Sequence, residues 1–286
     1  MTVVLETIQA ARRWVRTERS AGKTIGFVPT MGAFHEGHLS LMRRARQQCD
    51  RVVVSVFINP LQFGAGEDFE RYPRDFVRDL AQAEQEGVDA LFHPAAEEMY
   101  PAPQRIAIQV GRLGELLCGP ARPGHFAGVA TVVAKLLNIV QPDRIFFGQK
   151  DAQQAVIIER MIAELGFPVV MEVCPTVREA DGLAMSSRNA YLSAEERAKA
   201  TVLYRALCHA ATRIRCGERD ASRIESEMRE RIGAVAGAAL DYASVVDRRS
   251  LEGVQEIAGE VLVAVAVRFG KTRLIDNVIA GPGGEA

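Results

Sequence analysis

The sequence predicts an α/β protein with a doubly wound, Rossmann-like parallel sheet, followed by a smaller α+β domain. Three observations lead to this fold class. From Lys23 to about Pro175, short apolar runs alternate with amphipathic stretches, as expected of strands buried on both faces and joined by crossover helices. After Val177 the pattern changes to a loop, charged helical segments and late strand candidates. The 286 residues, 48% of them hydrophobic, suffice for one large or two modest domains.

The first domain is expected to cover residues 1–176. Its strand candidates are residues 25–29, 52–59, 90–93, 106–110, 145–148 and 169–173. Its helix candidates are residues 38–49, 75–85, 129–139 and 152–165, the last ended by Gly166 and Pro168. Because doubly wound sheets bind ligands beyond the carboxyl ends of their strands, residues directly after strands are the candidate site.

The second domain is expected to cover residues 177–286. A loop at residues 178–189 precedes a charged helix from about Ser193 and another helix near residues 222–235. Three strand candidates follow, at residues 242–246, 261–268 and 273–278. Loops between domains often close on substrate, so we expect this smaller domain to close over the active site.

Charge and hydropathy exclude several functional classes. The 35 Lys and Arg residues against 36 Asp and Glu residues give a net charge of −1. We therefore expect no nucleic acid partner, since bulk positive charge is what holds one. The longest apolar runs, residues 52–58 and 261–267, are far shorter than the roughly 18–20 residues of a membrane span. We expect no membrane segment.

The termini and cysteines favour a cytoplasmic location. The first ten residues include the acidic Glu6 and lack a basic leader, unlike a signal peptide. The five cysteines are scattered and form no C-x-x-C pair, which indicates reduced thiols. A nucleophilic cysteine would need a positioned base, and the sequence indicates none.

The strongest motif is the sequence PTMGAFHEGH at residues 29–38, between a buried strand and a helix that starts near His38. Gly32 and Gly37 let the backbone approach a ligand closely, and the helix N-terminus offers N–H groups to a phosphate. His35 and His38 add donors that can follow developing charge. Two alternatives are a metal-binding pair, although no third ligand lies at a supporting spacing, and two histidines in an exposed loop.

A second block, FINPLQF at residues 57–63, ends the most apolar strand. Its amides, Asn59 and Gln62, are suited to the hydroxyl and carboxylate groups of a small polar substrate. The alternative is an Asn-Pro turn that only caps the strand.

Three further blocks complete the candidate site. RPGHFAGV at residues 122–129 precedes a helix, and FGQKDAQQ at residues 147–154 follows a strand. In the latter, Lys150 suits a polyphosphate and Asp151 can cap the helix or bind a ribose hydroxyl, while the alternative is a solvated ion pair. MSSRN at residues 185–189 supplies two hydroxyls and a guanidinium that can clamp phosphate.

In this order and spacing, the five blocks resemble the pantothenate synthetase (pantoate–β-alanine ligase) family of the nucleotidylyltransferase superfamily, which has an H-x-G-H motif. They contain the family patterns PTMG-x-x-H-x-GH, F-x-NP-x-QF, RPGHF-x-GV, FG-x-KD-x-QQ and MSSRN-x-YL. The resemblance covers residues 26–192, and the second domain matches only by length and pattern. It implies condensation of pantoate with β-alanine, driven by ATP through a pantoyl adenylate, to give pantothenate for coenzyme A synthesis. It also implies Mg2+ and a homodimer.

The resemblance assigns roles to individual residues. His35 and His38 would bind phosphate, with His38 as the proton donor. Gln62 and Gln154 would hold pantoate, with Gln62 also near β-alanine and Asn59 in the same substrate group. Asp79 would help to hold Mg2+, unless it is a solvated helix residue. The predicted ATP contacts are Met31, Gly32, His35, Gly37, His38, Gly148, Gln149, Lys150, Asp151, Val177, Met185, Ser186, Ser187 and Arg188. Six of the predicted site residues form the predicted catalytic set: His35, His38, Lys150, Ser186, Ser187 and Arg188.

Three other functions compete with this interpretation. Another nucleotidylyltransferase would act on a phosphorylated acceptor, which would favour Arg or Lys in place of Gln62 and Gln154. A regulatory module would bind a nucleotide without turnover and would not need the donors His38, Lys150 and Arg188 to stabilise transferring charge. A tRNA-charging enzyme shares the histidine turn, but the near-neutral chain indicates no basic anticodon-binding domain.

Overall fold

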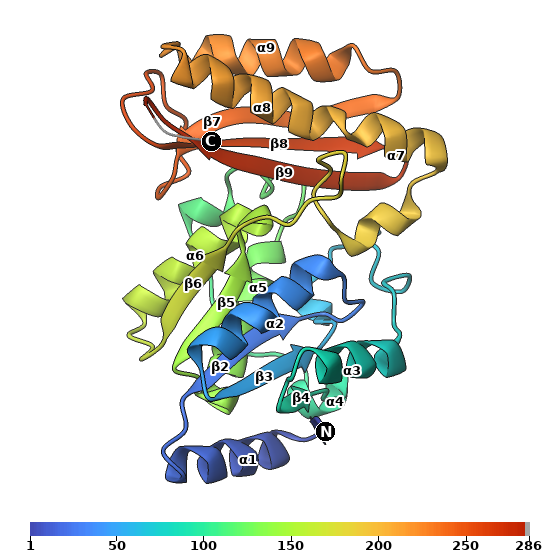
Figure 1. Cartoon of the computed structure of the whole chain (residues 1–286), viewed down its shortest axis with the longest axis vertical. Coiled ribbons are helices and arrows are strands. Elements are labelled where there is room, and N and C mark those ends of the chain that lie inside the picture. The colour runs from blue at the N-terminus through green and yellow to red at the C-terminus, as the bar shows by residue number, and fades with distance from the viewer. Residues whose placement is uncertain (284–286) are drawn as a thin grey trace. The chain divides into compact units, whose positions relative to one another are not determined.

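The computed structural model describes residues 1–283, which divide into two compact units (Figure 1). Unit 1 comprises residues 1–114, 121–148 and 154–175. Unit 2 comprises residues 115–120, 149–153 and 176–283. Two short segments, residues 115–120 and 149–153, thus belong to the same unit as the C-terminal part of the chain.

Unit 1 contains a six-stranded parallel sheet in the order β1-β4-β3-β2-β5-β6. Its strands are β1 (Val3–Leu5), β2 (Ile25–Thr30), β3 (Arg51–Val56), β4 (Ala90–Phe92), β5 (Arg144–Gly148) and β6 (Val170–Cys174). Helices along this part of the chain are α1 (Ile8–Ser20), α2 (Glu36–Gln48), α3 (Phe76–Gln85), α4 (Ala96–Met99), α5 (His125–Val140) and α6 (Ala152–Glu164). Two short 3-10 helices of this unit are η1 (Pro60–Gln62) and η2 (Arg112–Gly114).

Hydrophobic side chains cover both faces of this sheet. Phe27 and Val53 pack in one cluster with α1 and α5. Val28 and Val54, their neighbours along the strands, pack in a second cluster with α2 and α3. Since successive strand residues point to opposite faces, helices bury both sides of the sheet. The predicted doubly wound parallel sheet is confirmed.

The strand predicted at residues 106–110 is wrong, although its apolar residues alternate with others as in a half-buried strand. Ile106 is 85% exposed, and the Ile108 N–H donates to the Thr131 hydroxyl at 2.9 Å instead of to a neighbouring strand. The sixth strand is β1 at the sheet edge, which sequence analysis missed together with α1. The helix predicted at residues 129–139 begins earlier, at His125.

Unit 2 contains a three-stranded antiparallel sheet in the order β7-β8-β9. The strands are β7 (Ala238–Asp247), β8 (Val261–Phe269) and β9 (Thr272–Ala280). The helices are α7 (Ala194–Ala200), α8 (Val202–Arg215) and α9 (Ala221–Gly233), with 3-10 helices η3 (Gln149–Asp151) and η4 (Ser187–Tyr191). Helices α8 and α9 lie on one face of the sheet, where Leu207, Ile224 and Met228 join a core with Val263 and Val265 (Figure 1). The predicted α+β character is confirmed.

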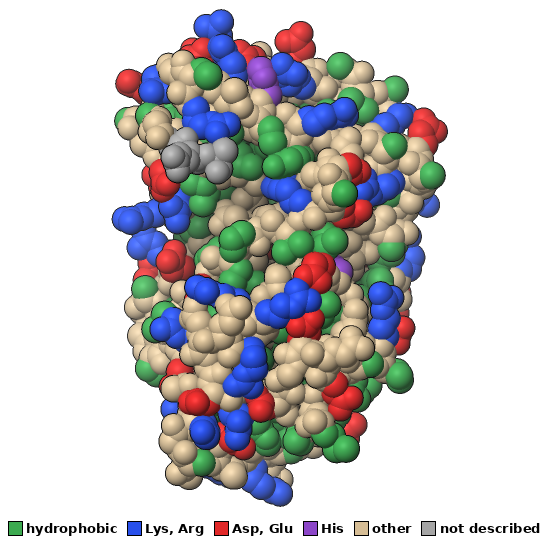
Figure 2. All heavy atoms as spheres, in the orientation of Figure 1, with side chains coloured by type: hydrophobic (Ala, Val, Ile, Leu, Met, Phe, Trp, Pro, Cys, Tyr) green, Lys and Arg blue, Asp and Glu red, His purple; other side chains and the backbone are tan. Residues whose placement is uncertain are grey.

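The described surface and thiols add three observations. On the face drawn in Figure 2, basic and acidic side chains intermingle, in line with the net charge of −1. No helix within residues 1–283 is both long and apolar enough to cross a membrane. All five cysteines carry free thiols, and Cys49, Cys118 and Cys174 are buried.

Candidate active site

The candidate site of unit 1 lies where three neighbouring strands end. Strands β3, β2 and β5 are adjacent and parallel, so their carboxyl ends meet at one edge of the sheet. From β2 the chain proceeds to β3 and β4 on one side, whereas β5 lies on the other side. This reversal is the topological switch point at which doubly wound sheets bind ligands. Within unit 1, the sequences that follow β2 and β3 are residues 31–38 and 57–62.

A buried carboxylate holds the turn that follows β2. The two oxygens of Asp79 accept hydrogen bonds from the N–H groups of Ala33 and Phe34, both at 2.8 Å. Asp79 lies in the first turn of α3 and is 1% exposed, so it is not a solvated helix residue. The Thr30 hydroxyl donates to the Ser55 carbonyl and accepts from the Gly32 N–H. The turn is therefore fixed from both α3 and β3.

The conformation of this turn requires glycine at position 32. Gly32 has a φ of 85°, and a Cβ there would lie 2.8 Å from Oδ2 of Asp79 and 3.0 Å from Cγ1 of Val56. A side chain would therefore displace the carboxylate. Burial raises the pKa of Asp79 above its ordinary value of 3.8, although the hydrogen bonds from Phe34 and Ala33 oppose this effect.

The two imidazoles of the turn cap helix α2. Nδ1 of His35 accepts from the Gly37 N–H at 3.1 Å, and Nδ1 of His38 accepts from the His35 N–H at 3.4 Å. A Cβ at Gly37 would lie 2.8 Å from the His35 ring, so glycine is what permits this contact. When Nδ1 of a neutral imidazole accepts, Nε2 carries the hydrogen. In the neutral form of each ring the hydrogen is therefore on Nε2, and the two ring centroids lie 4.2 Å apart.

Asn59, after β3, is fully engaged by the protein. Its Oδ1 accepts from the Leu61 N–H at 3.3 Å and from the Tyr100 hydroxyl at 2.9 Å. Its Nδ2 donates to Oε1 of Gln62 at 3.2 Å and to the Gly128 carbonyl at 3.1 Å. These four bonds use both donors and both lone pairs of the amide. Asn59 therefore caps η1 and also orients the neighbouring Gln62.

Gln62 retains capacity for a ligand. Its Nε2 lies 3.0 Å from Sδ of Met31, and its Oε1 accepts from Asn59. Within the described residues, one N–H and one lone pair of this amide remain. Gln154 lies in the first turn of α6, which follows β5, and is half-buried. Of these predicted residues, the structure brings Met31 and Gln62 into contact.

A side chain of the block at residues 122–129 contacts the backbone of Gln62, a role that the sequence did not indicate. Nδ1 of His125 lies 2.8 Å from the Gln62 carbonyl oxygen, and Nε2 of His125 lies 2.8 Å from Nη1 of Arg122. Since the carbonyl can only accept, Nδ1 carries a hydrogen. The Arg122 guanidinium also binds both carboxylate oxygens of Glu67, at 2.8 and 2.7 Å. The sequence motif contains Arg122 and His125, but only the fold shows that Glu67 and Gln62 are their partners.

The remaining predicted residues belong to unit 2. Gln149, Lys150 and Asp151 form η3, where Nζ of Lys150 lies 3.5 Å from Oδ1 of Asp151. The Met185 N–H donates to the Val177 carbonyl at 3.0 Å. Ser186 caps η4, which contains Ser187 and Arg188, by accepting from the Arg188 N–H at 3.3 Å.

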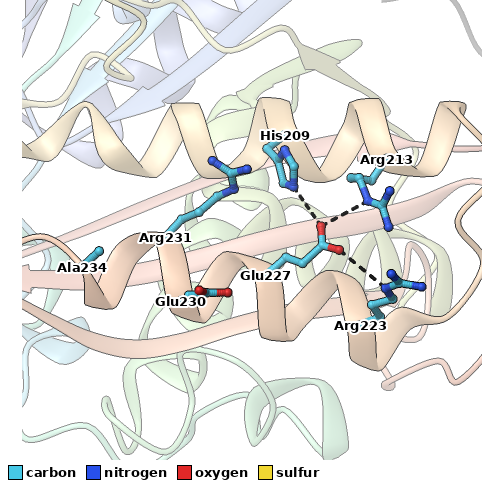
Figure 3. Close-up of a pocket in the computed structure, with 7 residues that line it drawn as sticks. All are labelled: His209, Arg213, Arg223, Glu227, Glu230, Arg231 and Ala234. Atoms are coloured by element: carbon cyan, nitrogen blue, oxygen red, sulfur yellow. Dashed lines mark hydrogen bonds and ion pairs between the residues drawn. The ribbon is translucent and has the colours of Figure 1, made fainter.

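Unit 2 also has a cavity of about 560 Å³ between α8 and α9 (Figure 3). There Glu227 binds Nε2 of His209 at 2.8 Å and pairs with Arg213 at 3.2 Å and Arg223 at 3.7 Å. Although burial opposes it, the His209 hydrogen bond helps to hold the pKa of Glu227 below its ordinary value. None of the residues that line this cavity is a predicted site residue. Its charged groups pair mainly with one another, which indicates a structural ion-pair network.

The raised pKa of Asp79 predicts a pH-dependent contribution to stability. A carboxyl with a raised pKa binds protons more tightly in the folded state, so its contribution to the free energy of unfolding grows as the pH falls through the raised value toward 3.8. The difference in unfolding free energy between the wild type and Asp79→Asn should therefore shift in favour of the wild type as the pH is lowered. Each tenfold difference in proton affinity is worth about 1.4 kcal/mol. Urea denaturation between pH 7 and pH 4 measures the difference.

Glu84→Gln is the control, because Glu84 is an exposed carboxylate of the same helix. A difference for Asp79→Asn that stays constant with pH, or moves against the wild type on acidification, would contradict the assigned effect of burial.

Comparison with known proteins identifies the family of the chain. A sequence model described as pantoate-beta-alanine ligase matches residues 3–279. Relatives named pantothenate synthetase include those of Heliobacterium modesticaldum, 58% identical over 96% of this chain and 98% of the relative, and Syntrophomonas wolfei, 56% identical with the same coverage. The pantothenate synthetase structure from Thermus thermophilus superposes with a TM-score of 0.92 at 47% identity, covering 97% of this chain and 99% of that one. The pantoate-beta-alanine ligase of Francisella tularensis, solved in complex with beta-gamma ATP and beta-alanine, matches with a TM-score of 0.78 at 31% identity, covering 98% of both chains. The chain belongs to the pantoate-beta-alanine ligase family.

Proposed function

We propose that the protein condenses pantoate with β-alanine at the expense of ATP, giving pantothenate, AMP and pyrophosphate on the route to coenzyme A. One observation supports this most directly: two imidazoles at the start of α2 and the amide of Gln62 follow adjacent strands of the sheet. The first set of groups suits phosphate oxygens, and the second suits a polar, uncharged or carboxylate-bearing substrate. Membership of the family supports the same function.

The reaction has two steps. In the first step, a carboxylate oxygen of pantoate attacks the α-phosphorus of ATP, and the bond to pyrophosphate breaks. In the second step, the amine of β-alanine attacks the acyl carbon of the adenylate, the bond to AMP breaks, and the amine loses a proton. Adenylation turns a poor leaving group into AMP, so the protein chiefly has to stabilise the charge that builds on phosphate oxygens.

In unit 1, His35 and His38 would donate their Nε2 hydrogens to phosphate oxygens, with His38 as the proton donor. Gln62 and Gln154 would bind pantoate, and Gln62 would also meet β-alanine. Asn59 would act by orienting Gln62, because its own hydrogen bonds are made within the protein. The nucleotide contacts of this unit would be Met31, Gly32, Gly37 and Gly148.

In unit 2, the cationic and hydroxyl groups would bind the triphosphate. These groups are Lys150, Ser186, Ser187 and Arg188. The other proposed nucleotide contacts of this unit are Gln149, Asp151, Val177 and Met185. A flexible ammonium and a planar guanidinium are suited to polyphosphate charge.

Mg2+ would enter as part of the ATP substrate, bound to its phosphates. Asp79, which the family resemblance links to the ion, is a poor ligand where it stands, since it is buried and both its oxygens accept backbone hydrogen bonds. Within residues 1–283, no group of three or more His, Cys, Asp or Glu side chains is placed to hold a metal ion, and Mg2+ commonly relies on substrate phosphates for many of its ligands. The chemistry that the ion would supply is neutralisation of charge on the pyrophosphate leaving group.

The protein would act in the cytoplasm as a homodimer. Its free thiols support a reducing compartment. The dimer follows from the family resemblance.

Exchange of labelled pyrophosphate into ATP tests the proposed function. Because adenylation is reversible and precedes the amine, exchange should occur with pantoate and Mg2+ present and β-alanine absent. The measurement is label incorporated into ATP over time.

Omission of pantoate is the matched control. Another nucleotidylyltransferase would exchange only with its own acceptor, and a regulatory module would show no exchange. Absence of pantoate-dependent exchange in folded, ATP-binding protein would overturn the proposed function.

His38→Ala should retain the fold and lose turnover by roughly 10²–10⁴, the scale for removing one acid–base or charge-stabilising group. The side chain is half-buried at the start of α2, so its loss should affect catalysis more than packing. Steady-state kinetics together with circular dichroism measure both effects. Near-normal turnover in folded protein would remove His38 from the mechanism.

Gln62→Ala and Gln154→Ala should weaken the use of pantoate much more than the binding of ATP. Each removes amide hydrogen bonds worth about 0.5–1.5 kcal/mol, or more if a buried carboxylate loses its partner. Calorimetric titration separates the two ligands. If ATP affinity collapsed while pantoate binding stayed intact, the amides would have been assigned to the wrong substrate.

A further inference from the structure

We propose that Asp276 and Asn277, adjacent residues of β9, are positioning residues that set the Lys150 segment and the loop leading to Arg188 for ATP binding. Neither residue lies in the sequence blocks that carry the family resemblance. The proposal rests on the proposed function, since it takes Lys150 and the Ser186–Arg188 region to bind the triphosphate.

Asn277 holds the backbone of the Lys150 segment. Its Nδ2 donates to the carbonyl oxygens of Gln149 at 3.0 Å and Lys150 at 2.9 Å. Its Oδ1 accepts from Nε2 of Gln149 at 2.9 Å. Asn277 is 4% exposed, so these bonds are shielded from water. One amide thus fixes the two residues that precede Asp151 in a 3-10 turn, whose own internal bonds are few.

Asp276 holds the start of the other segment. Its carboxylate accepts two hydrogen bonds from Arg178, at 2.6 and 3.0 Å, and is 2% exposed. Arg178 also donates to the Gly182 carbonyl at 3.1 Å, and its guanidinium lies 4.0 Å from the centre of the Tyr204 ring. This buried ion pair is bidentate, so it fixes the relative orientation of Arg178 and Asp276 as well as neutralising their charges.

Arg178 begins a small hairpin that leads to the proposed phosphate-binding residues. Residues 178 and 184 form an antiparallel bridge, and the Glu179 N–H donates to the Leu183 carbonyl at 2.8 Å. The Met185 N–H then donates to the Val177 carbonyl at 3.0 Å. The position of Arg178 therefore determines where the chain enters the Ser186 cap.

The two anchors are coupled to each other. The Asn277 N–H donates to Oδ1 of Asp276 at 2.8 Å, so the carboxylate that binds Arg178 also restrains the residue that binds the Lys150 segment. β9 itself is paired with β8 along its length. A rigid strand thus supports two irregular segments, which is how preorganised sites hold charged groups in place.

Asn277→Asp tests the proposal with little change of shape. The substitution retains an acceptor for Gln149 but replaces the two donors with an oxygen that repels the carbonyls of Gln149 and Lys150. We expect the KM for ATP in pantoate-dependent pyrophosphate exchange to rise about tenfold or more, the effect of losing two hydrogen bonds, with the KM for pantoate changed less than about twofold. Thr272→Val, a buried polar site at the other end of β9, is the control and should leave both constants unchanged.

A double-mutant cycle with Lys150→Ala separates positioning from general destabilisation. If Asn277 acts through Lys150, Asn277→Asp should cause less than about a threefold further loss in the Lys150→Ala background. Equal losses in both backgrounds, or an unchanged KM for ATP in the single variant, would overturn the proposal. Should Asn277→Asp fold poorly, Arg178→Lys is the second variant, and it should likewise raise the KM for ATP because a lysine cannot bind Asp276 with two prongs.

The wild type distinguishes failure of this inference from failure of the proposed function. Wild-type exchange with unaffected Asn277 variants would contradict the inference alone. A wild type without exchange would contradict the proposed function, and calorimetric affinity for ATP would then still test the positioning role. Equal ATP affinity of wild type and Asn277→Asp in that titration would overturn it.

Discussion

The candidate site of unit 1 depends on one buried carboxylate. Asp79 ties the first turn of α3 to the turn after β2 through two backbone N–H groups. Without it, the N–H groups of Ala33 and Phe34 would lack these partners, a cost of about 1–3 kcal/mol for each that is buried. The carboxylate is itself expensive to bury, and its place near a helix N-terminus offsets part of that cost. The turn that Asp79 holds leads directly into the start of α2, where His35 and His38 cap the helix. Asp79 therefore helps to orient the two imidazoles.

Much of the fold could be predicted from sequence because central parallel strands are buried on both faces. β2, β3 and β5 are nearly continuous apolar runs, and β8 is as apolar as they are. The edge strand β1 could not be found, since it has three residues and leaves Val3 and Val4 exposed. The wrong strand at residues 106–110 has a related cause: Ile108 and Val110 do pack on the core, but no neighbouring strand pairs with the segment.

The sequence located the chemical groups of the site but not the contacts that orient them. The glycines and histidines of residues 32–38 stand in one short motif, so local rules are enough to mark them. Asp79 reaches the turn from 45 residues away, and Asn277 reaches Lys150 from 127 residues away. Such pairings depend on strand order and register, which no local pattern specifies. The roles of individual residues toward the substrates, and the boundary between the domains, remain predictions.

The amide N–H of Gln62 donates to the sulfur of Met31, and this determines how easily the amide can change to another acceptor. A thioether is a weak acceptor, whereas a carboxylate oxygen makes a hydrogen bond roughly twice as strong as a neutral one. Under the proposed function, pantoate would therefore displace a weak partner from the amide N–H of Gln62. Oxidation of Met31 to the sulfoxide would replace this weak acceptor with a strongly polar oxygen. The sulfoxide oxygen would then accept from the same amide and, under the proposed function, would compete with pantoate for it.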